Sequence, residues 1–326
     1  MPVGLGDTET LPGGARVTFV PAGHILGAAI IELQLENDGT SRRLVFSGDL
    51  GVQGSRLLPR PRSVERPDYL IMESTYGDRE RDHEADRTET LFGIIRDTVA
   101  QEGKVVIPSF AVGRTQEVLT RLNDLVEAGR LPGLRVYVDS PMAVPATKAF
   151  ALHPEAYSQP VQELLASGDA PLQFPGLSLV TQVADSIAIN KSREPAVIIS
   201  ASGMCTAGRV KHHLKHTLAD SRNTIIFVGY QAAGSLGRVI QAGTSPVRIF
   251  GQWYPLKARV ETIEGFSAHA DRTELLDWFA SLGGPPQRTF LVHGEETASL
   301  SLADAIAERF GADVAVPTPG QHFGLS

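Results

Sequence analysis

Short apolar runs rich in β-branched residues recur along this chain, and each ends near a residue able to take part in chemistry. RVTFVP precedes Ala-Gly and His24, RRLVFSG precedes Asp49, and DYLIM precedes Glu73. A further run, residues 289–292, is followed by His293. Such runs are typical of buried strands, and in open α/β sheets ligands bind beyond the carboxyl ends of the strands. The pattern therefore predicts an α/β fold with a polar site built from strand ends.

The middle of the chain alternates between strand and helix patterns. GKVVIPSF, LRVYVDSPM, PAVIISASGM and NTIIFVGY predict strands, and LFGIIRDTVAQEG and TQEVLTRLNDLVEAG predict helices. Strands that alternate with helices of this length predict βαβ units and a parallel sheet. A polar stretch at residues 80–87 suggests a boundary, and short strand patterns return after residue 245. We therefore predict a discontinuous first domain, residues 1–84 and 246–326, interrupted by an inserted domain, residues 85–245.

The segment from Gly265 to Glu295 carries two histidines on either side of a helix pattern. GFSAHAD places His269 just before the helix, which Asp271 caps together with a glutamate three residues later. The apolar stripe of this helix consists of Leu275, Leu276, Phe279 and Leu282. The following strand ends at His293. Two histidines presented in this way, with acids at other strand ends, suggest a hydrolytic metal site.

Composition narrows the classes of function. With 326 residues, 42% hydrophobic and 21% charged, the chain has the profile of a large globular protein. Its net charge of −7 argues against nonspecific binding of anionic polymers over the whole surface, although a local basic groove is compatible with it. The single cysteine, Cys205, excludes an internal disulfide and suits a reducing cytoplasm, which we predict as the location. No apolar run approaches the roughly 18 residues of a membrane span, so we expect no membrane partner.

Histidines and carboxylates at separate strand ends are the side chains that a hydrolytic metal centre needs. Taken singly, His24, Asp49 and His293 are more typical of ordinary loop and turn residues. Taken together they predict metal ligands, because such centres gather imidazole nitrogens and carboxylates from several strand ends. A carboxylate can hold two cations about 3.5–4 Å apart, one to activate water and one to stabilise phosphoryl oxygens. Asp49 is the natural candidate for that bridge.

Several short motifs occur in an order typical of one protein family. They are AGHILGA, FSGDLG, ESTYGDR, PSFAVGRTQE, DSPMA, SASGM, GYQAAGSLGR, GFSAHAD and LVHGE. On these motifs, over essentially its whole length, the chain resembles the β-CASP group of metallo-β-lactamase-fold nucleases. The resemblance implies a metallo-β-lactamase αββα sandwich, incomplete at its N-terminal end, interrupted by a β-CASP α/β parallel-sheet domain. It also implies zinc-dependent hydrolysis of RNA phosphodiester bonds by metal-activated water.

The site residues resemble particular motif positions of that family. By position, His24, Asp49 and His293 resemble metal ligands, with Asp49 in the place of the aspartate that bridges two zinc ions. Glu73 resembles the acid of β-CASP motif A, and we expect it to orient a ligand or catalytic histidine. His269 resembles the histidine of motif B, and we expect it to protonate the leaving oxygen or hold the scissile phosphate. A histidine at position 293 is similar to the RNA-acting members rather than the DNA-acting ones.

The chain departs from the family pattern at its start. The principal metal motif, His-x-His-x-Asp-His, is expected well before AGHILGA, yet only 23 residues precede His24. Four of the seven ligands implied by the family are not found, and we favour an N-terminally truncated enzyme over a degenerate paralogue. With three ligands left, we expect weak or partial zinc binding and little nuclease activity from these residues alone. We also expect strands within residues 16–35 to lack sheet neighbours, which predicts poor solubility.

Some loops offer candidate contacts to RNA phosphates. SASGM, with Ser202 and Gly203, lies at a strand end before a helix and can present backbone N–H groups to a phosphate. Arg114 lies at a comparable strand-to-helix junction, and Ser267 of GFSAHAD completes these candidates. Glycine in such loops serves tight turns equally well, so neither loop is diagnostic alone.

A basic segment follows SASGM. Residues 204–222 include Arg209, Lys211, Lys215 and Arg222, with three histidines and one acid, Asp220. The segment forms either a lip that attracts RNA phosphates or an ordinary solvated helix face, and the sequence leaves both open.

Other interpretations of the whole chain also stay open. A non-catalytic β-CASP paralogue that binds RNA or a protein partner is the main alternative to a nuclease. A hydrolase of small esters or thioesters is less compatible with the inserted domain. For the nuclease we expect single-stranded RNA as the partner. The sequence leaves open the endonuclease or exonuclease mode and whether the chain forms a homodimer.

Overall fold

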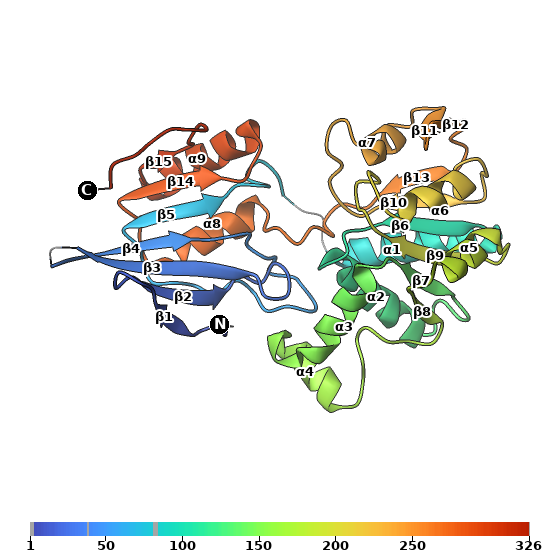
Figure 1. Ribbon diagram of the computed structural model, residues 1–326, viewed down its shortest axis with the longest axis horizontal. Coiled ribbons are helices and arrows are strands. Elements are labelled where there is room, and N and C mark those ends of the chain that lie inside the picture. The colour runs from blue at the N-terminus through green and yellow to red at the C-terminus, as the bar shows by residue number, and fades with distance from the viewer. Residues whose placement is uncertain (1–2, 38, 81–83, 326) are drawn as a thin grey trace. The chain divides into compact units, whose positions relative to one another are not determined.

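The computed structural model of the protein describes residues 3–37, 39–80 and 84–325. The chain forms two compact units (Figure 1), the first consisting of Met1–Arg81 and Ala268–Ser326 and the second of Asp82–Ser267. The chain thus leaves the first unit, forms the second and returns. The domain limits predicted from the sequence differ from the limits of these two units. The limit at 84/85 lies beside residues 81–83, which are outside the described residues, and the limit at 245/246 comes earlier than the return after Ser267.

The first unit contains a seven-stranded mixed sheet with the order β1-β2-β3-β4-β5-β14-β15. The strands are β1 (Thr8–Thr10), β2 (Arg16–Pro21), β3 (Ala29–Asn37), β4 (Thr40–Phe46), β5 (Tyr69–Glu73), β14 (Arg288–Val292) and β15 (Val314–Ala315). β1 to β4 pair antiparallel, whereas β4, β5, β14 and β15 pair in parallel. The strands β5 and β14 are adjacent although the whole second unit separates them in the sequence, so the sheet joins the two ends of the chain.

The start of this sheet differs from the sequence-based expectation. Residues 8–10 form β1, which pairs with β2 through Thr8↔Thr18 to Thr10↔Arg16. β2 therefore has a neighbour on each side, and β3 lies between β2 and β4. The expectation that strands within residues 16–35 lack sheet neighbours is wrong, because a three-residue strand too short for a periodic signal supplies the missing pairing.

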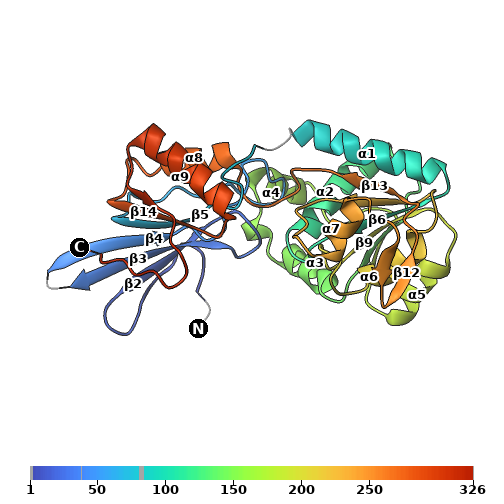
Figure 2. The ribbon, with the colours of Figure 1, turned by 90° about the horizontal axis from the view of Figure 1, so that it is seen from above.

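Two helices, α8 (Arg272–Ala280) and α9 (Glu296–Phe310), lie on one face of the sheet (Figure 2). Asp271 and Glu274 form the predicted reciprocal cap at the start of α8. The predicted apolar residues of this segment, Leu275, Leu276, Phe279 and Leu282, are buried together with Leu70 and Met72 of β5 and Leu302 and Ile306 of α9. Because this core rests directly on β5 and β14, it fixes the strand ends that carry the candidate site.

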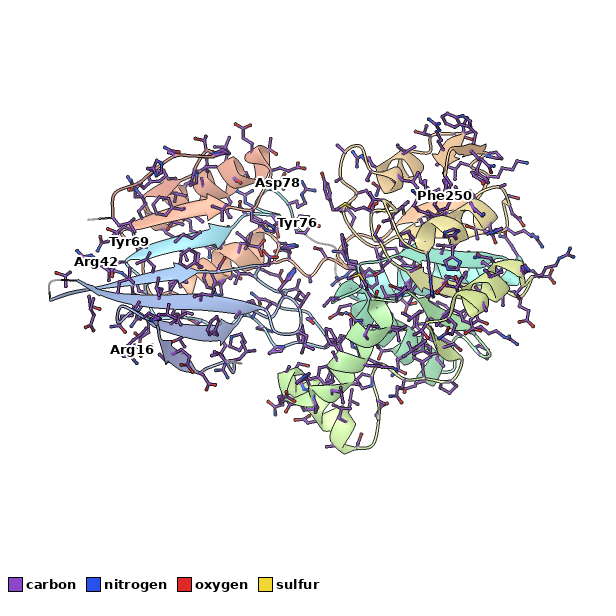
Figure 3. All side chains as sticks on the ribbon, viewed as in Figure 1. Arg16, Arg42, Tyr69, Tyr76, Asp78 and Phe250 are labelled. Atoms are coloured by element: carbon purple, nitrogen blue, oxygen red, sulfur yellow. The ribbon has the colours of Figure 1, made fainter. Side chains whose placement is uncertain are left out.

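Side chains from three strands of the sheet, β4, β5 and β14, form a second, smaller apolar cluster. Tyr69 of β5 (labelled in Figure 3) is buried with Leu44 and Phe290, and Phe323 from the C-terminal segment contacts Phe290 edge-on with ring centroids 4.8 Å apart. The C-terminal segment thus packs against strand residues and helps to exclude water from them.

The second unit contains a six-stranded sheet whose pairings are all parallel, with the order β13-β10-β6-β9-β7-β8. Its strands are β6 (Lys104–Pro108), β7 (Val136–Asp139), β8 (Leu177–Val180), β9 (Ala196–Ser200), β10 (Thr224–Phe227) and β13 (Arg259–Thr262). The helices are α1 (Glu84–Ala100), α2 (Arg114–Glu127), α3 (Ala143–Leu152), α4 (Gln159–Ala166), α5 (Val183–Lys191), α6 (Val210–Thr217) and α7 (Leu236–Gln241), with a short 3-10 turn at Pro154–Ala156. This is the parallel α/β arrangement predicted from the alternating patterns.

Strands after residue 245 also belong to the second unit. β11 (Val247–Ile249) and β12 (Gln252–Tyr254) form a two-stranded hairpin, and β13 pairs in parallel with β10. The sequence-based limit at 245 therefore cut this unit short, because a strand that follows a hairpin cannot be assigned to a sheet until its partner is known. Among the described helices, none has the length and apolar character needed to cross a bilayer.

Candidate active site

Five predicted site residues come together in the first unit. Asp49 follows β4, Glu73 ends β5 and His293 follows β14. Since β4, β5 and β14 are adjacent and parallel, their carboxyl ends share one edge of the sheet. His24 lies in the loop after β2, and His269 lies just before α8. Segments far apart in the sequence thus deliver all five side chains to one place.

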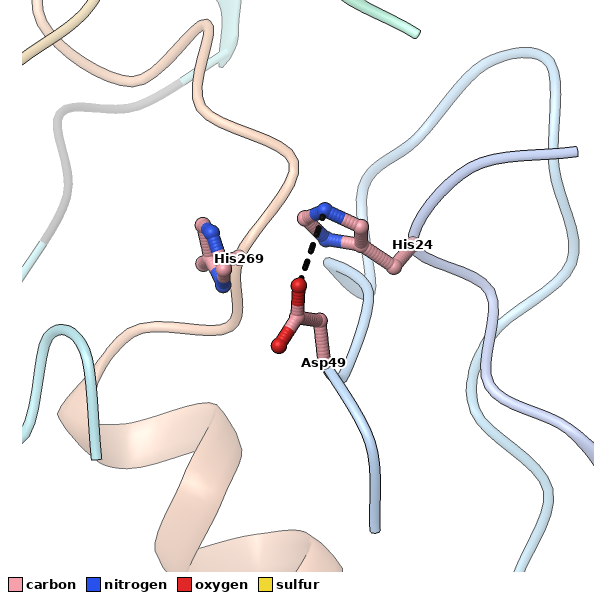
Figure 4. Close-up of side chains that lie close together, drawn as sticks. All are labelled: His24, Asp49 and His269. Carbon is pink, nitrogen blue, oxygen red and sulfur yellow. Dashed lines mark ion pairs between the residues drawn. The ribbon is translucent and has the colours of Figure 1, made fainter. Parts of the chain in front are cut away.

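Asp49 lies between two histidines. Its Oδ2 is 3.7 Å from Nε2 of His24, and its Oδ1 is 3.1 Å from Nδ1 of His293. Figure 4 shows the contact with His24 and the neighbouring ring of His269, whose centroid is 4.3 Å from that of His24. Each carboxylate oxygen of Asp49 therefore faces a different imidazole.

Two overlapping groups have the spacing of metal ligands. The ligand atoms of His24, Asp49 and His269 all lie within 4.8 Å of one another, and so do those of Glu73, His269 and His293. Imidazole nitrogens and carboxylate oxygens are the atoms that bind zinc in hydrolytic sites, so this donor set fits zinc. His269, predicted as a proton donor or phosphate contact, belongs to both groups.

Glu73 and His269 form a partly buried pair. Nδ1 of His269 is 3.0 Å from Oε2 of Glu73, whose side chain is only 1% exposed. The other oxygen of Glu73 accepts a hydrogen bond from the backbone N–H of Leu50 at 2.5 Å. Burial alone would raise the pKa of Glu73, but the hydrogen bond and charge of His269, with hydrogen bonds from Thr75 and the Leu50 backbone, outweigh burial, so this pKa lies below its usual value. Glu73 is thus an acceptor for His269, and its role as the orienting acid stays a prediction.

His24 is the most enclosed histidine of the group. Burial lowers its pKa, and the nearby His269 lowers it further, while Asp49 acts in the opposite direction. Its Nδ1 is buried and has no partner at hydrogen-bonding geometry among the described residues. A buried nitrogen without a partner is costly, and ligand binding is one way to compensate that cost.

Tight backbone turns hold the site residues in place. His293 adopts φ +58°, a left-handed conformation uncommon outside glycine, and its carbonyl oxygen accepts a hydrogen bond from Thr75 Oγ1 at 3.0 Å. A Cβ on Gly51 would lie 2.0 Å from the carbonyl oxygen of Gly23. Glycine at position 51 therefore allows the loop that carries His24 to approach the loop after Asp49.

Several supporting residues were not predicted from the sequence. Ser47 Oγ accepts a hydrogen bond from the backbone N–H of Glu73 at 3.0 Å, and Thr75 contacts the backbone of His293. Tyr76 (labelled in Figure 3) turns its ring edge toward His269 at 6.1 Å between centroids, and Arg79 lies over the Tyr76 ring. The available signal was the place of Thr75, Tyr76 and Arg79 in ESTYGDR and of Ser47 in FSGDLG, but a motif does not reveal which neighbour faces the site.

The candidate phosphate contacts all belong to the second unit. Arg114, at the start of α2, donates from Nε to the carbonyl oxygen of Phe266 at 3.2 Å and lies over the ring of Phe110. The Ser202 hydroxyl contacts the backbone of Ala207, and Ser267 is buried. A Cβ at Gly203 would lie 2.9 Å from the Phe110 ring, so that glycine has a packing role. Internal contacts thus account for much of this set, and its binding of phosphate stays a prediction.

The basic segment is also partly internal. Arg209 donates to Asp139 Oδ1 at 2.6 Å and to the Thr181 carbonyl oxygen at 2.6 Å. Nε2 of the buried His213 lies 2.7 Å from the other Asp139 oxygen. Lys211, by contrast, places its Nζ 4.9 Å from the centre of the Phe250 ring. Ion pairing inside the unit accounts for Arg209 without RNA, whereas Lys211 lies next to an exposed aromatic residue.

Comparison with protein families adds two matches. Residues 115–240 match the Beta-Casp domain, and residues 253–317 match the Zn-dependent metallo-hydrolase RNA specificity domain. The first match lies within the second unit described above. The second runs from the β11–β12 hairpin through α8 and β14 to β15, and so includes His269 and His293.

Curated relatives are similar over nearly the whole chain. The chain is 41% identical over 312 residues to ribonuclease TTHA0252 of Thermus thermophilus, covering 95% of this chain and 69% of that protein. It is 35% identical to transcription termination factor FttA of Methanocaldococcus jannaschii and 36% identical to that of Pyrococcus abyssi, covering 51% and 49% of those proteins. A crystallised protein of unknown function from Enterococcus faecalis V583 shares the fold, with a TM-score of 0.54, 14% identity and coverage of 98% of this chain and 66% of that one.

Proposed function

The chain belongs to the β-CASP group of metallo-β-lactamase-fold ribonucleases, and from this premise we propose that it hydrolyses phosphodiester bonds of single-stranded RNA with zinc. The observation that carries the proposal is the position of Asp49 between His24 and His293, beside the Glu73–His269 pair. A carboxylate shared by two histidines, next to a histidine oriented by a buried acid, provides both metal ligands and a proton donor.

Zinc would be held by His24, Asp49 and His293. We propose that two ions would bind, because the two carboxylate oxygens of Asp49 face different histidines. The lowered pKa of His24 supports this role, because a metal ligand must be the neutral imidazole. Zinc, when bound, supplies Lewis acidity toward phosphoryl oxygens and activates water.

The chain's own residues would handle the proton of the leaving group. Hydrolysis adds the oxygen of water to phosphorus and breaks the bond to the leaving oxygen, which must take up a proton. His269 is the donor in this proposal, because Glu73 accepts at Nδ1 and so orients the ring. Ser47 acts on this pair indirectly, by holding the backbone of Glu73, and Thr75 holds the backbone of the proposed zinc ligand His293.

A single-turnover assay tests the proposal. The chain, in excess over a 5′-labelled single-stranded RNA, is expected to cleave it slowly when zinc is added and to stop when EDTA is added. Asp49→Asn and His269→Ala should abolish this cleavage. Asp313→Asn and His322→Ala, which change exposed residues of the same unit, should leave it unchanged.

The outcomes separate the candidate functions. Cleavage that needs neither zinc nor Asp49 would overturn the proposed centre, as would intact RNA at every zinc concentration. RNA binding without any cleavage would favour the non-catalytic alternative. A DNA strand of the same sequence serves as the substrate control, and equal cleavage of it would overturn the preference for RNA.

A further inference from the structure

The β11–β12 hairpin of the second unit presents aromatic side chains to solvent. Phe250 at its tip is 52% exposed, and Trp253 on β12 is 64% exposed. The inner face of the hairpin is apolar, since Val247 and Ile249 are buried in the core of the unit. Arg248 and Trp253 are direct cross-strand partners on the outer face. The hairpin therefore has a packed side that fixes it and an open side that carries aromatic and basic groups.

Phe250 occupies a backbone conformation that does not suit it. Its φ is +49° and that of Gly251 is +80°, so the two-residue turn needs left-handed residues at both positions. Asparagine or glycine adopts this conformation at little cost, whereas a bulky side chain does so only against strain. About half of the accessible surface of Phe250 is exposed, so burial compensates little of that strain. Strain of this kind, kept in an exposed aromatic residue, is typical of a functional position.

Positive charge surrounds these rings. Lys211 Nζ is 4.9 Å from the Phe250 ring centre, and Arg248 Cζ is 6.0 Å from that of Trp253, both within cation–π range. The exposed His212 stacks obliquely on Phe250, with centroids 4.7 Å apart. Burial lowers the pKa of His212, and the charges of Lys215, His213 and Lys211 lower it further, as expected in a field of positive sign. The patch is therefore basic although the chain carries a net charge of −7.

We propose that the hairpin surface, formed by Arg248, Phe250 and Trp253 with Lys211 and His212 of α6, binds single-stranded RNA. Unpaired bases would stack on Phe250 and Trp253, while phosphates lie near Lys211 and Arg248. The proposal rests on the proposed function only in taking RNA as the ligand. It adds a binding surface in the second unit that uses none of the strand-end residues of the first.

The chemistry of the surface favours an RNA strand over other partners. Planar rings alternate with cations, which suits bases that alternate with phosphates. The exposed large apolar side chains among the described residues 247–254 are both aromatic, whereas a docking face for a protein helix would need aliphatic anchors as well. Double-stranded RNA fits less well, because its bases are already stacked inside the helix.

Trp253 provides a direct readout of this binding. The chain has two tryptophans, and Trp278 is only 6% exposed, so the exposed Trp253 is the one that a stacking base can reach. An oligouridine of about 12 nucleotides, added in EDTA to prevent cleavage, should quench tryptophan emission along a saturable curve. Trp253→Phe should remove that response, and a duplex of the same length should produce little quenching.

Variants test the contribution of each ring by fluorescence anisotropy of a labelled oligouridine. Phe250→Asn and Trp253→Ala should each weaken binding about tenfold, within the range found for loss of one stacked base. Phe250→Asn should also leave the melting temperature unchanged or raised, since asparagine relieves the backbone strain. Leu152→Ala, which removes a side chain 76% exposed elsewhere in the same unit, is the matched control and should not affect binding.

Two further measurements test the role of positive charge and the choice of RNA over other partners. Lys211→Ala should reduce the dependence of affinity on salt, whereas Lys191→Ala, at an exposed position on α5, should not. Equal RNA affinity in wild type, Phe250→Asn and Trp253→Ala would overturn the hairpin surface while leaving the proposed hydrolysis intact. Quenching by phosphatidylserine vesicles but not by RNA would also overturn it. A chain that neither binds nor cleaves RNA would contradict both proposals.

Discussion

At the scale of single residues, Glu73 acts on the candidate site through His269. Its carboxylate is buried, ionised and bonded to both the Leu50 backbone and the His269 ring. The carboxylate therefore controls how the imidazole is oriented and which of its nitrogens carries the proton. In the proposed mechanism this is a positioning role, since Glu73 acts on the proton donor His269.

Replacing Glu73 with glutamine tests that role. Glu73→Gln keeps the side-chain shape but removes the carboxylate that orients His269, so the rate of zinc-dependent cleavage should fall about 10- to 100-fold. Glu65→Gln, at a side chain 82% exposed in the same unit, is the matched control. An unchanged cleavage rate in Glu73→Gln would contradict the assignment.

Alanine substitution of Gly51 tests the close approach of the two loops that carry His24 and Asp49, and Gly93 is the control. Gly51→Ala places a methyl group against the Gly23 carbonyl and should destabilise the protein by about 1–3 kcal/mol. Gly93→Ala, in α1, meets nothing within 4 Å and should stabilise it by about 0.5–1 kcal/mol. Urea unfolding of both variants measures these changes. Effects of the same sign would show that the loops adjust around the added methyl group.

The sequence predicted those site residues that lie at the ends of recognisable strands. Asp49, Glu73 and His293 each follow a short apolar run, and parallel pairing brings such ends to one edge. Which nitrogen of His269 faces Glu73 could not be predicted, because it depends on packing between distant segments. The contacts of Ser47 and Thr75 were missed for the same reason.

At the scale of elements, α8 links the site to the core. Its N-terminal cap lies two residues after His269, and Glu274 also accepts a hydrogen bond from the backbone N–H of Gln53 at 2.7 Å. The cap thus ties the helix to the loop that follows Asp49.

Loss of the cap should therefore lower both the stability of the protein and its rate of RNA cleavage. Asp271→Ala leaves the Glu274 backbone N–H without its acceptor and should cost about 1 kcal/mol of unfolding free energy. Cleavage should also slow, because the start of α8 positions His269. Asp304→Asn, at an exposed position within α9, should change neither quantity. A decrease in stability with an unchanged cleavage rate would limit the cap to a structural role.

Long elements with strong periodicity could be predicted, and short ones could not. The α8 helix and four of the six parallel strands of the second unit, β6, β7, β9 and β10, appear where the patterns placed them. β1, with three residues, and the β11–β12 hairpin have too few positions to show alternation. Their places depend on which neighbours they pair with, which a local pattern does not contain.

At the scale of the whole molecule, acid stability should depend on a buried charge cluster in the second unit. Burial would raise the pKa of Asp139, but hydrogen bonds from His213, Ser186 and Arg209 outweigh burial and keep this pKa below its usual value. A carboxyl group with a lowered folded-state pKa stabilises the fold above its unfolded pKa of about 3.9. That stabilisation is lost as the pH falls through the lower, folded-state pKa.

Chemical unfolding between pH 2 and 6 measures this contribution. Asp139→Asn should lower stability at neutral pH, because Arg209 is left without its anionic partner, and should flatten the fall in stability below about pH 4. Asp97→Asn, at a partly exposed carboxylate of the same unit, should leave the pH profile as in the wild type. An Asp139→Asn profile with the wild-type slope would assign the acid sensitivity to other carboxyl groups.

The sheet that joins both chain ends also has a consequence for synthesis. The ribosome synthesises the strands β1 to β5 before the second unit, and β5 can pair with β14 only after all of the second unit has emerged. During that interval an apolar strand edge is open to wrong pairing, while the second unit, continuous in the sequence, can already fold. The first unit therefore completes its sheet only after the second unit has been synthesised, and protection by a chaperone would matter most in that interval.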